Sequence, residues 1–224
     1  MYKSKHLMKR SIITTQDGSS SISIENWGET YHSIFGAVQE AVHVYIKNGL
    51  LLINKPSLNI LEMGFGTGLN FCLTYKEALL RNLEIQYTAV EGFPLTENEF
   101  LSLNYFSYFP DFSFEEIHRL TWDETHQLTK NISLHKNYSL FENLSLPHDH
   151  YDLIYFDVFG YNYQPELWSE TILQNMFHCL KSDGILVTYA SKGVVNRTLK
   201  SIGFTVKKMP GPPGKREMTI AIKP

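Results

Sequence analysis

The sequence predicts an α/β domain built on a mostly parallel sheet, and three observations support this fold class. Apolar segments of strand length alternate with segments of helical periodicity from residue 58 onward. One apolar segment ends in an acid and runs directly into a glycine-rich turn, Glu62-Met63-Gly64-Phe65-Gly66-Thr67-Gly68. The last two apolar segments flank a Pro- and Gly-rich turn at residues 210–214, which predicts a terminal antiparallel hairpin.

Length and composition set the broad class of the protein. The 224 residues, 43% of them hydrophobic, are enough for one sizeable core, so we expect an N-terminal extension at residues 1–55 packed on a main domain at residues 56–224. A net charge of −3 excludes a strongly basic nucleic-acid module. Cys72 and Cys179 lie in apolar helical patterns, which indicates buried thiols and no disulfide framework.

Targeting and metal signals are missing from the sequence. The N-terminus has no apolar signal segment, and no apolar run approaches the length of a membrane span. No spacing of His or Cys suggests a metal site. We therefore expect a cytoplasmic protein without a bound metal and without a membrane partner.

Local patterns assign the elements in chain order. Before the glycine-rich turn, we expect a hairpin at 11–24 and a helix at 34–53. The expected core elements are strands at 58–63, 84–90, 151–156 and 185–189, helices at 69–81, 95–104, 165–181 and 194–202, and terminal strands at 204–209 and 217–222. The region from 106 to 146 is harder to assign, and we expect a helix at 122–130 and a strand at 132–135.

The glycine-rich turn predicts a site for a nucleoside cofactor. Gly64 and Gly66 permit positive φ angles and close approach of a ligand, and Gly68 lets the following helix pack tightly. Glu62 would repel a pyrophosphate, and the Gly-x-Gly-x-Gly spacing differs from the Gly-x-Gly-x-x-Gly of dinucleotide oxidoreductases. An acid here suits a ligand with an ammonium group and a ribose, such as S-adenosylmethionine.

Two further acids follow predicted strands, at the edge where open α/β sheets bind ligands. Glu91 ends the second strand, where a carboxylate can accept hydrogen bonds from both ribose hydroxyls. Asp157 ends the strand at 151–156 and begins an aromatic loop in which Phe159 and Tyr161 are able to wall a cavity and stack a base. The alternatives are that the acids cap helices and that the aromatic side chains cover the core.

The C-terminal region contains a concentration of cations. Lys215 and Arg216 follow a stiff turn, and together with five other cations they are able to form a basic face that engages phosphates. The other five are Lys192, Arg197, Lys200, Lys207 and Lys208. The alternative is an ordinary solvated surface.

These motifs together resemble the methyltransferase domain of the MnmC family, in its stand-alone form. The resemblance covers residues 14 to 224. Its sequence blocks are Tyr31-His32-Ser33, Gly36-Ala37 with Glu40, Glu62 to Phe71, Glu91-Gly92-Phe93-Pro94-Leu95-Thr96, Asp157 to Trp168, Thr188-Tyr189-Ala190-Ser191, and Gly214-Lys215-Arg216-Glu217-Met218. The family often has Asp-Gly-Phe-Ala-Pro where this chain has Asp157-Val158-Phe159-Gly160-Tyr161, and its Asn-Pro is Gln164-Pro165 here. An acid common near the adenine has no counterpart at residues 137–139.

The resemblance implies a class I S-adenosyl-L-methionine-dependent methyltransferase fold, Rossmann-like, with tRNA modification as its activity. The implied reaction methylates the 5-aminomethyl group of wobble uridine 34 in tRNA, giving 5-methylaminomethyl(-2-thio)uridine. Bifunctional relatives carry a flavin-dependent oxidase half that this sequence lacks, so we expect a separate enzyme to supply the aminomethyl intermediate. The implied partner is the anticodon stem-loop of tRNA.

The resemblance also assigns roles to individual residues. The implied cofactor-binding residues are Glu62, Gly64, Phe65, Gly66, Thr67, Gly68, Asn70, Glu91 and Gly92. Asp157 and Phe159 are implied to be catalytic, and Tyr161, Lys215 and Arg216 to bind the substrate. Two alternatives stay open: a methyltransferase acting on a small-molecule amine or a protein, and a non-catalytic nucleotide-binding or interaction module.

Overall fold

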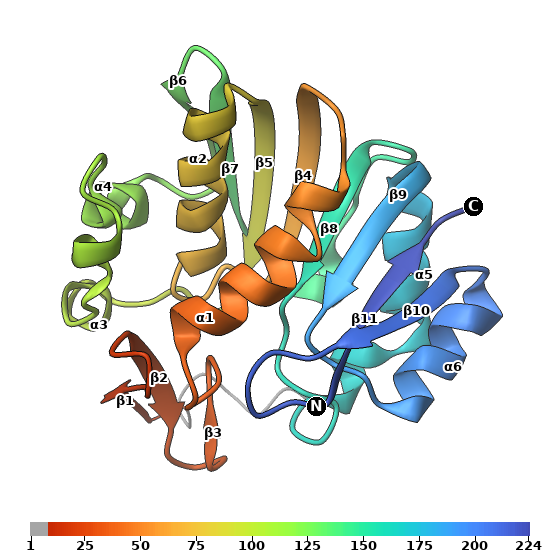
Figure 1. Cartoon of the computed structure of the whole chain (residues 1–224), viewed down its shortest axis with the longest axis horizontal. Coiled ribbons are helices and arrows are strands. Elements are labelled where there is room, and N and C mark those ends of the chain that lie inside the picture. Colours follow the sequence, from red (N-terminus) through yellow and green to blue (C-terminus); the bar gives the residue numbers. More distant parts are fainter. Residues whose placement is uncertain (1–8) are drawn as a thin grey trace.

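The computed structural model describes residues 9–224 and contains an eight-stranded sheet in the order β10-β11-β9-β8-β4-β5-β7-β6 (Figure 1). The five central strands β9, β8, β4, β5 and β7 run parallel, whereas β6, β10 and β11 pair antiparallel at the two edges. The strands are β4 (Ser57–Met63), β5 (Glu84–Glu91), β6 (Glu124–Thr129), β7 (Ile132–Tyr138), β8 (Tyr151–Phe156), β9 (Leu180–Thr188), β10 (Thr205–Pro210) and β11 (Glu217–Ile222).

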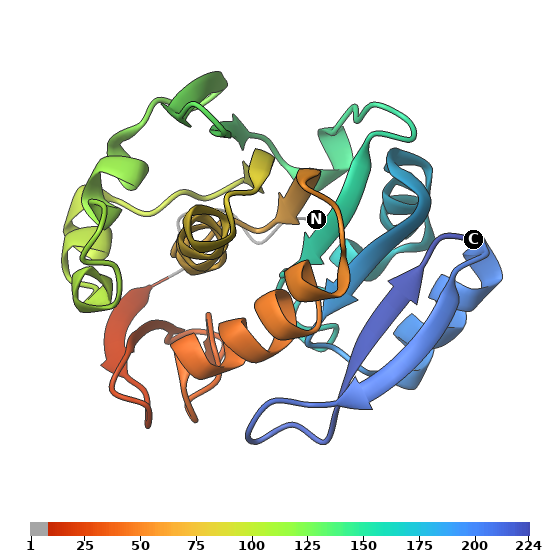
Figure 2. The ribbon, with the colours of Figure 1, turned by 45° about the horizontal axis from the view of Figure 1, so that its top comes forward.

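Helices cover both faces of this sheet (Figures 1 and 2). One face carries α1 (Ala37–Ala41), the π-helix η2 (Val42–Lys47) and α2 (Leu69–Arg81). The other face carries α5 (Glu170–Cys179) and α6 (Gly193–Ile202). Each layer buries its own apolar cluster, and the cluster under α1, η2 and α2 also takes in side chains of the N-terminal elements. Cys72 and Cys179 are free and buried in these clusters, as predicted.

A second, three-stranded antiparallel sheet lies beyond the carboxyl ends of the central strands (Figure 1). It consists of β1 (Arg10–Thr14), β2 (Ser20–Ile24) and β3 (Glu29–Thr30). Arg10 donates hydrogen bonds to the carbonyl oxygens of Phe93 and Pro94 at 2.6 and 3.3 Å, and it pairs with Glu99 at 3.3 Å. The extension is therefore attached to the edge where open α/β sheets bind ligands. The domain division at residue 55 stays a prediction.

Most of the predicted elements are present, but four predictions are wrong or incomplete. The predicted helix at 122–130 is the edge strand β6, because pairing with β7 outweighs the weak local preference. The predicted helix at 34–53 is divided into α1, η2 and a 3₁₀ turn at Leu50–Leu52. The predicted helix at 165–181 begins with a 3₁₀ turn at Pro165–Trp168, and its last two residues belong to β9.

The remaining differences are local. The helix expected at 95–104 is only α3 (Glu97–Leu101), because Thr96 caps its N-terminus through a capping box with Glu99. The short helix α4 (Phe114–Arg119) was not expected from the sequence. Among residues 9–224, no helix is both long enough and apolar enough to pass through a bilayer.

The strand order reverses between β4 and β8. From β4 the chain moves outward to β5 and β7, and it then returns to β8 and continues outward on the other side to β9. The carboxyl ends of β4 and β8 therefore separate at a topological switch point, which is where ligands bind in open α/β sheets.

Candidate active site

The glycine-rich loop and the loop after β8 touch at the switch point. The backbone N–H groups of Gly64 and Phe65 donate to the carbonyl oxygen of Val90 at 3.0 and 3.1 Å. Gly64 has a φ of 96°, and a Cβ at this position would lie 2.4 Å from the carbonyl oxygen of Asp157. Only glycine is compatible with this approach, so Gly64 fixes the distance between the two loops.

The end of the glycine loop is supported from the side of the N-terminal extension and α4. Gly68 has a φ of 73° and is the N-cap of α2. Thr67 is buried; its hydroxyl lies 3.4 Å from Nε2 of His32, and its carbonyl oxygen lies 2.9 Å from Nε2 of His118. Phe65 packs against the His118 ring. These contacts with His32 and His118 support the loop, and Phe65, Gly66 and Thr67 line a cavity.

Asn70, in the first turn of α2, connects the acids of two strands. Its Nδ2 donates to Oε1 of Glu62 at 2.9 Å and to Oδ2 of Asp157 at 2.8 Å. Asp157 is ionised at neutral pH and only accepts hydrogen bonds, so this end of the amide must be the donor. Its Oδ1 is buried and accepts no hydrogen bond from residues 9–224, although Asn70 lines the cavity.

Glu62 lies under the loop and not on the cavity wall. It is fully buried, and besides Asn70 it accepts a hydrogen bond from the Tyr87 hydroxyl at 2.9 Å. Burial and the nearby Asp157 raise the pKa of the Glu62 carboxyl well above its usual value, which favours the uncharged form. Its predicted contribution to cofactor binding is therefore exerted through Asn70 and the loop, and that contribution stays a prediction.

Glu91 lies where two cavities meet. Its carboxylate accepts the N–H of Gly66 at 2.9 Å and the N–H of Phe93 at 2.8 Å, so both oxygens are held by backbone. One cavity is lined by the glycine loop, and the other is lined by Gly92, Ser139 and Leu140. Glu91, Val158 and Phe159 line both cavities, which therefore adjoin each other along these three residues.

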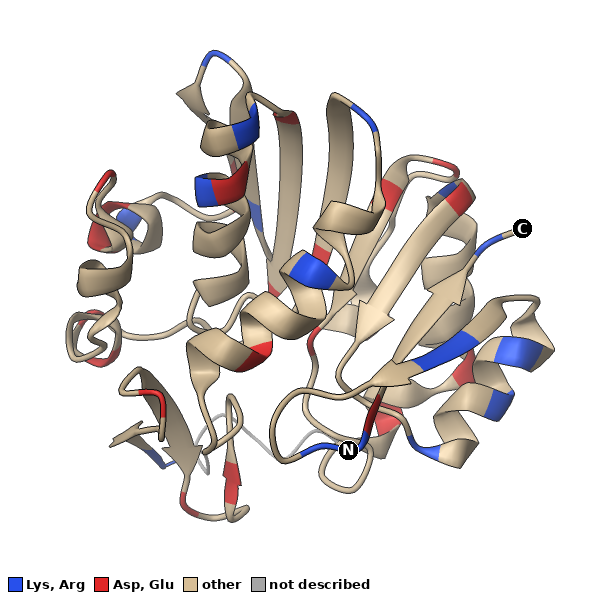
Figure 3. Cartoon of the chain, in the orientation of Figure 1, with Lys and Arg blue, Asp and Glu red and all other residues tan. Residues whose placement is uncertain are grey.

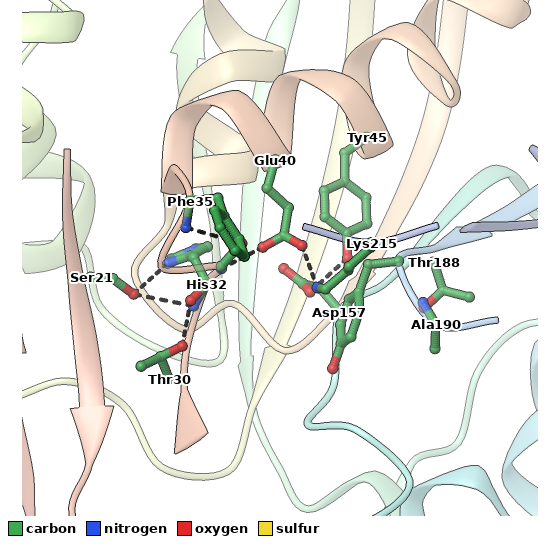
Figure 4. A network of polar contacts seen from close by, with 12 residues as sticks. Ser21, Thr30, His32, Phe35, Glu40, Tyr45, Asp157, Thr188, Ala190 and Lys215 are labelled. Carbon is green, nitrogen blue, oxygen red and sulfur yellow. Dashed lines mark hydrogen bonds and ion pairs between the residues drawn. The ribbon is translucent and has the colours of Figure 1, made fainter. Parts of the chain in front are cut away.

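Asp157 follows β8 and lines the cavity beside Asn70. Its Oδ1 accepts a hydrogen bond from the Tyr45 hydroxyl at 2.6 Å (Figure 4). Its Oδ2 accepts the bond from Asn70. Burial raises the pKa of Asp157 to about 6, while the hydrogen bonds from Tyr45 and Asn70 oppose this rise. At neutral pH Asp157 is therefore a carboxylate that readily accepts a hydrogen bond or a proton.

The N-terminal extension supplies one wall of the cavity. Phe159 packs edge-on against Trp27 and Tyr31, with ring centroids 5.3 and 5.2 Å apart. Tyr31 and His32 line the cavity with Phe159, and burial lowers the pKa of His32 to about 4, so that this ring is neutral at pH 7. The wall is therefore aromatic and uncharged.

The predicted substrate-binding residues lie in an outer cavity that shares Tyr189 with the inner one. Tyr161 and Arg216 line it, and Nζ of Lys192 lies 5.2 Å from the centroid of the Tyr161 ring. Lys215 also lines this cavity, but its ammonium forms an ion pair with Glu40 of α1 and lies 3.8 Å from the centroid of the Tyr189 ring (Figure 4). Lys215 is thus less available to phosphates than the sequence suggests.

The inner cavity fits a nucleoside that carries an ammonium group. No residue in the described part of the chain donates to Oδ1 of Asn70, and the carboxylate of Asp157 accepts a hydrogen bond from Nδ2 of the same amide. Gly66 lies close to the Tyr31 ring, because a Cβ at position 66 would be only 3.2 Å from a carbon atom of that ring. An ammonium near Asn70 and a ribose near Glu91 would satisfy the polar atoms of the two connected cavities.

Comparisons with known proteins agree with this fit. A family model described as S-adenosyl-L-methionine-dependent methyltransferase matches residues 115–224. The chain is 28% identical over 215 residues to the tRNA 5-methylaminomethyl-2-thiouridine biosynthesis bifunctional protein MnmC of Cupriavidus metallidurans, covering 87% of this chain and 31% of that protein. It is 30% identical over 216 residues to the protein of the same name from Ralstonia nicotianae, covering 88% of this chain and 32% of the relative.

A solved structure shows the same fold. The crystal structure of MNMC2 from Aquifex aeolicus has a TM-score of 0.79 and 24% sequence identity, and it covers 97% of this chain and 71% of that chain. The chain is an MnmC-like methyltransferase domain. Its cofactor is S-adenosyl-L-methionine, and the predicted class I fold is confirmed. This MnmC-like chain spans about a third of the length of the curated relatives it matches.

Sequence analysis missed several residues of the site. Tyr45 was assigned only to an apolar helical pattern, yet its hydroxyl contacts Asp157. Tyr31, Glu40 and Tyr189 were noted in motif blocks of the MnmC family but received no role. Tyr31 and Tyr189 line the inner cavity, and all three residues line a neighbouring cavity beside Lys215. The polar groups embedded in those blocks were the available signal; Tyr45 had none, because its hydroxyl acquires a partner only through tertiary packing.

Proposed function

We propose that this chain methylates the amino nitrogen of the 5-aminomethyl group of wobble uridine 34 in tRNA, giving 5-methylaminomethyl(-2-thio)uridine. The observation that carries the proposal is the carboxylate of Asp157, held by two donors in a cavity continuous with the cofactor loop. The names of the MnmC relatives supply the substrate class, because they describe tRNA 5-methylaminomethyl-2-thiouridine biosynthesis.

The residues of the site suit transfer of a methyl group to an amine. When bound, S-adenosyl-L-methionine supplies an activated methyl group on a sulfonium. Asp157 accepts a hydrogen bond from the substrate amine, orients its lone pair and takes up the proton that the product must release. Phe159 and Tyr31 exclude water from this position, so water does not compete with the amine for the methyl group. Catalysis then depends mainly on positioning, to which the two bonds on Asp157 contribute.

The distribution of charge supports an RNA substrate. Residues 184–216 contain seven Lys or Arg and no acid, although the whole chain has a net charge of −3. These cations lie at the start of α6 and along it, on β10 and in the turn before β11 (Figure 3). Lys192, Lys215 and Arg216 line the outer cavity. We assign this segment, together with Tyr161 and Arg216, to the anticodon stem-loop, whose wobble base must be splayed out to be reached.

The proposal includes the source of the substrate and the place of the reaction. A separate enzyme supplies the aminomethyl group at uridine 34, since the reaction proposed here begins from that amine. The protein then acts in the cytoplasm, where tRNA is available.

The deciding experiment is methyl transfer from labelled S-adenosyl-L-methionine to tRNA from cells that lack this gene, followed by nucleoside mass spectrometry. We expect 5-methylaminomethyluridine to increase at the expense of 5-aminomethyluridine. Cofactor binding without any gain of mass in a nucleoside would overturn the RNA substrate and direct the search to small-molecule amines or proteins. Failure to bind the cofactor would favour a non-catalytic module.

A further inference from the structure

The N-terminal extension contacts Asp157 through the hydroxyl group of Tyr45. Tyr45 lies in the π-helix η2, is 2% exposed, and donates to Oδ1 of Asp157 at 2.6 Å (Figure 4). It lies behind Asp157 and outside the set of residues that line the cofactor cavity. A residue in this place acts on the substrate only through Asp157.

The backbone of η2 suggests that the position of Tyr45 is specified. Helix α1 continues into six residues of π-helix, Val42–Lys47, before a 3₁₀ turn. π-Helical segments are rare and occur mostly at functional sites, because they shift side chains relative to an α-helix. Here the irregular segment directs Tyr45 toward the end of β8, where its ring packs on Tyr155 with centroids 5.1 Å apart.

We propose that Tyr45 is a positioning residue of the methyl-transfer site: its hydroxyl holds the Asp157 carboxylate ionised and turned so that its free lone pairs face the substrate amine. This inference rests on the function proposed above. Asn70 fixes Oδ2 and Tyr45 fixes Oδ1, so neither oxygen is able to rotate away from its donor. The extension is then part of the catalytic machinery and not only a support for the cofactor loop.

The groups around Asp157 affect its pKa in opposite directions, and the hydrogen bond from Tyr45 is one of those that lower it. The groups that face Asp157 from the neighbouring elements are Glu40 of α1, Glu62 of β4, Asn70 of α2, Tyr87 of β5, Tyr189 after β9 and Lys215 before β11. Burial and the charge of Glu40 raise the pKa of Asp157, whereas hydrogen bonds from Tyr45 and Asn70 and the charge of Lys215 lower it. Burial and the charge of Asp157 raise the pKa of the Tyr45 phenol well above its usual value, so the hydroxyl remains a donor.

The test titrates Asp157 itself, without a substrate. Carboxyl ¹³C resonances of labelled aspartate are followed against pH in the wild type and in Tyr45→Phe, and Asp157→Asn identifies the resonance. We expect the midpoint of Asp157 to rise by about 1–2 pH units in Tyr45→Phe, because a hydrogen bond to the charged form is lost. The matched control is Tyr155→Phe, which removes another buried hydroxyl, bonded to Thr74 at 3.1 Å, and should leave the midpoint unchanged.

A second variant moves the midpoint in the other direction. Replacement of Tyr45 by a difluorotyrosine gives a more acidic phenol and a stronger donor, so the midpoint of Asp157 should fall below that of the wild type. Loss of packing has no means of producing this opposite shift. The acidic limb of the kcat profile should follow the same order in the three proteins, with KM for S-adenosyl-L-methionine unchanged.

The outcomes separate this inference from the proposed function. An Asp157 midpoint that stays in place in both Tyr45 variants would overturn the role of Tyr45, even if the wild type methylates tRNA. If the Asp157 titration midpoints move as expected but the protein methylates no tRNA, the positioning role of Tyr45 would be supported and the proposed substrate would be overturned.

Discussion

At the scale of single residues, the Asn70 amide has one satisfied end and one unsatisfied end. Its Nδ2 donates to Glu62 and to the ionised Asp157, whereas its Oδ1 is buried and has no donor among the described residues. Such a group is costly unless a ligand donates to it. In the function proposed above, the ammonium group of the cofactor would supply the missing donor.

We expect Asn70→Ala to weaken the affinity for S-adenosyl-L-methionine about 10- to 100-fold, because a hydrogen bond to a charged group contributes about 1.5–3 kcal/mol. Isothermal titration calorimetry measures this change. The matched control is Asn196→Ala, which removes another buried amide, one that accepts a hydrogen bond from Thr219 at 3.0 Å. An unchanged affinity in Asn70→Ala would contradict the assignment of its Oδ1 to the cofactor.

Asp157 is expected to control turnover and its dependence on pH. Burial raises its pKa to about 6, and the reaction needs the ionised form, so kcat should fall as the pH drops through about 6 and level off above it. Asp157→Ala should lose about 10²- to 10⁴-fold in kcat and show no such acidic limb, while its affinity for the cofactor changes little. Single-turnover assays on tRNA measure both effects, and wild-type kcat in this variant would refute the role.

At the scale of elements, α1 and the segment that precedes β11 meet beside Asp157. Glu40 of α1 accepts the Ser33 N–H at 2.6 Å and pairs with Lys215, which precedes β11. The Glu40 side chain is 7% exposed, so this pair is far less screened by solvent than a surface ion pair. It joins the N-terminal extension to the terminal hairpin beside Asp157.

We expect Glu40→Ala to lower the free energy of unfolding by about 1–3 kcal/mol, because the Ser33 N–H and the half-buried Lys215 both lose their acceptor. Urea denaturation measures the change. Glu77→Ala is the control, because the Glu77–Arg81 pair lies on exposed positions of α2 and should contribute less than about 0.5 kcal/mol. Equal losses in the two variants would show that the Glu40 contact has no special weight.

The elements of the parallel core were predictable, because buried strands such as β4 and β8 are continuous apolar runs and α2 follows a glycine turn. Edge strand β6 was not, because its burial alternates weakly and its pairing with β7 depends on tertiary context. For the site, the loop glycines and Asp157 lie together after β4 and β8, and their roles stay predictions. The contact of Tyr45 was not predictable, because it joins residues that lie 112 positions apart.

At the scale of the whole molecule, charge is divided between two regions. Residues 184–216 contain seven cations and no acid (Figure 3). Lys192, Lys215 and Arg216 of this segment line the outer cavity together with Glu217. A polyanion is therefore attracted to one side of an otherwise acidic protein, and the acidic remainder limits binding elsewhere. In the function proposed above, this arrangement would direct an anticodon stem toward Tyr161 and the mouth of the inner cavity.

The last prediction follows from this division. Replacing Lys192, Arg197 and Arg216 together by Gln should weaken tRNA binding and reduce the slope of log K against log salt by about 2–3, because each phosphate contact contributes about 0.7–0.9. A filter-binding series from low to high salt measures the slope. The affinity for S-adenosyl-L-methionine should stay unchanged, because these side chains lie outside the inner cavity.

The control for this triple variant removes the same charge elsewhere. Lys76, Arg81 and Lys130 lie on α2 and at the β6–β7 turn, away from the outer cavity, and their replacement by Gln should leave the slope nearly unchanged. Equal losses in the two triple variants would show that net charge alone sets the affinity, and the outer cavity would lose its assignment as the RNA entrance. A loss confined to the first variant would place the anticodon stem over α6 and the terminal hairpin.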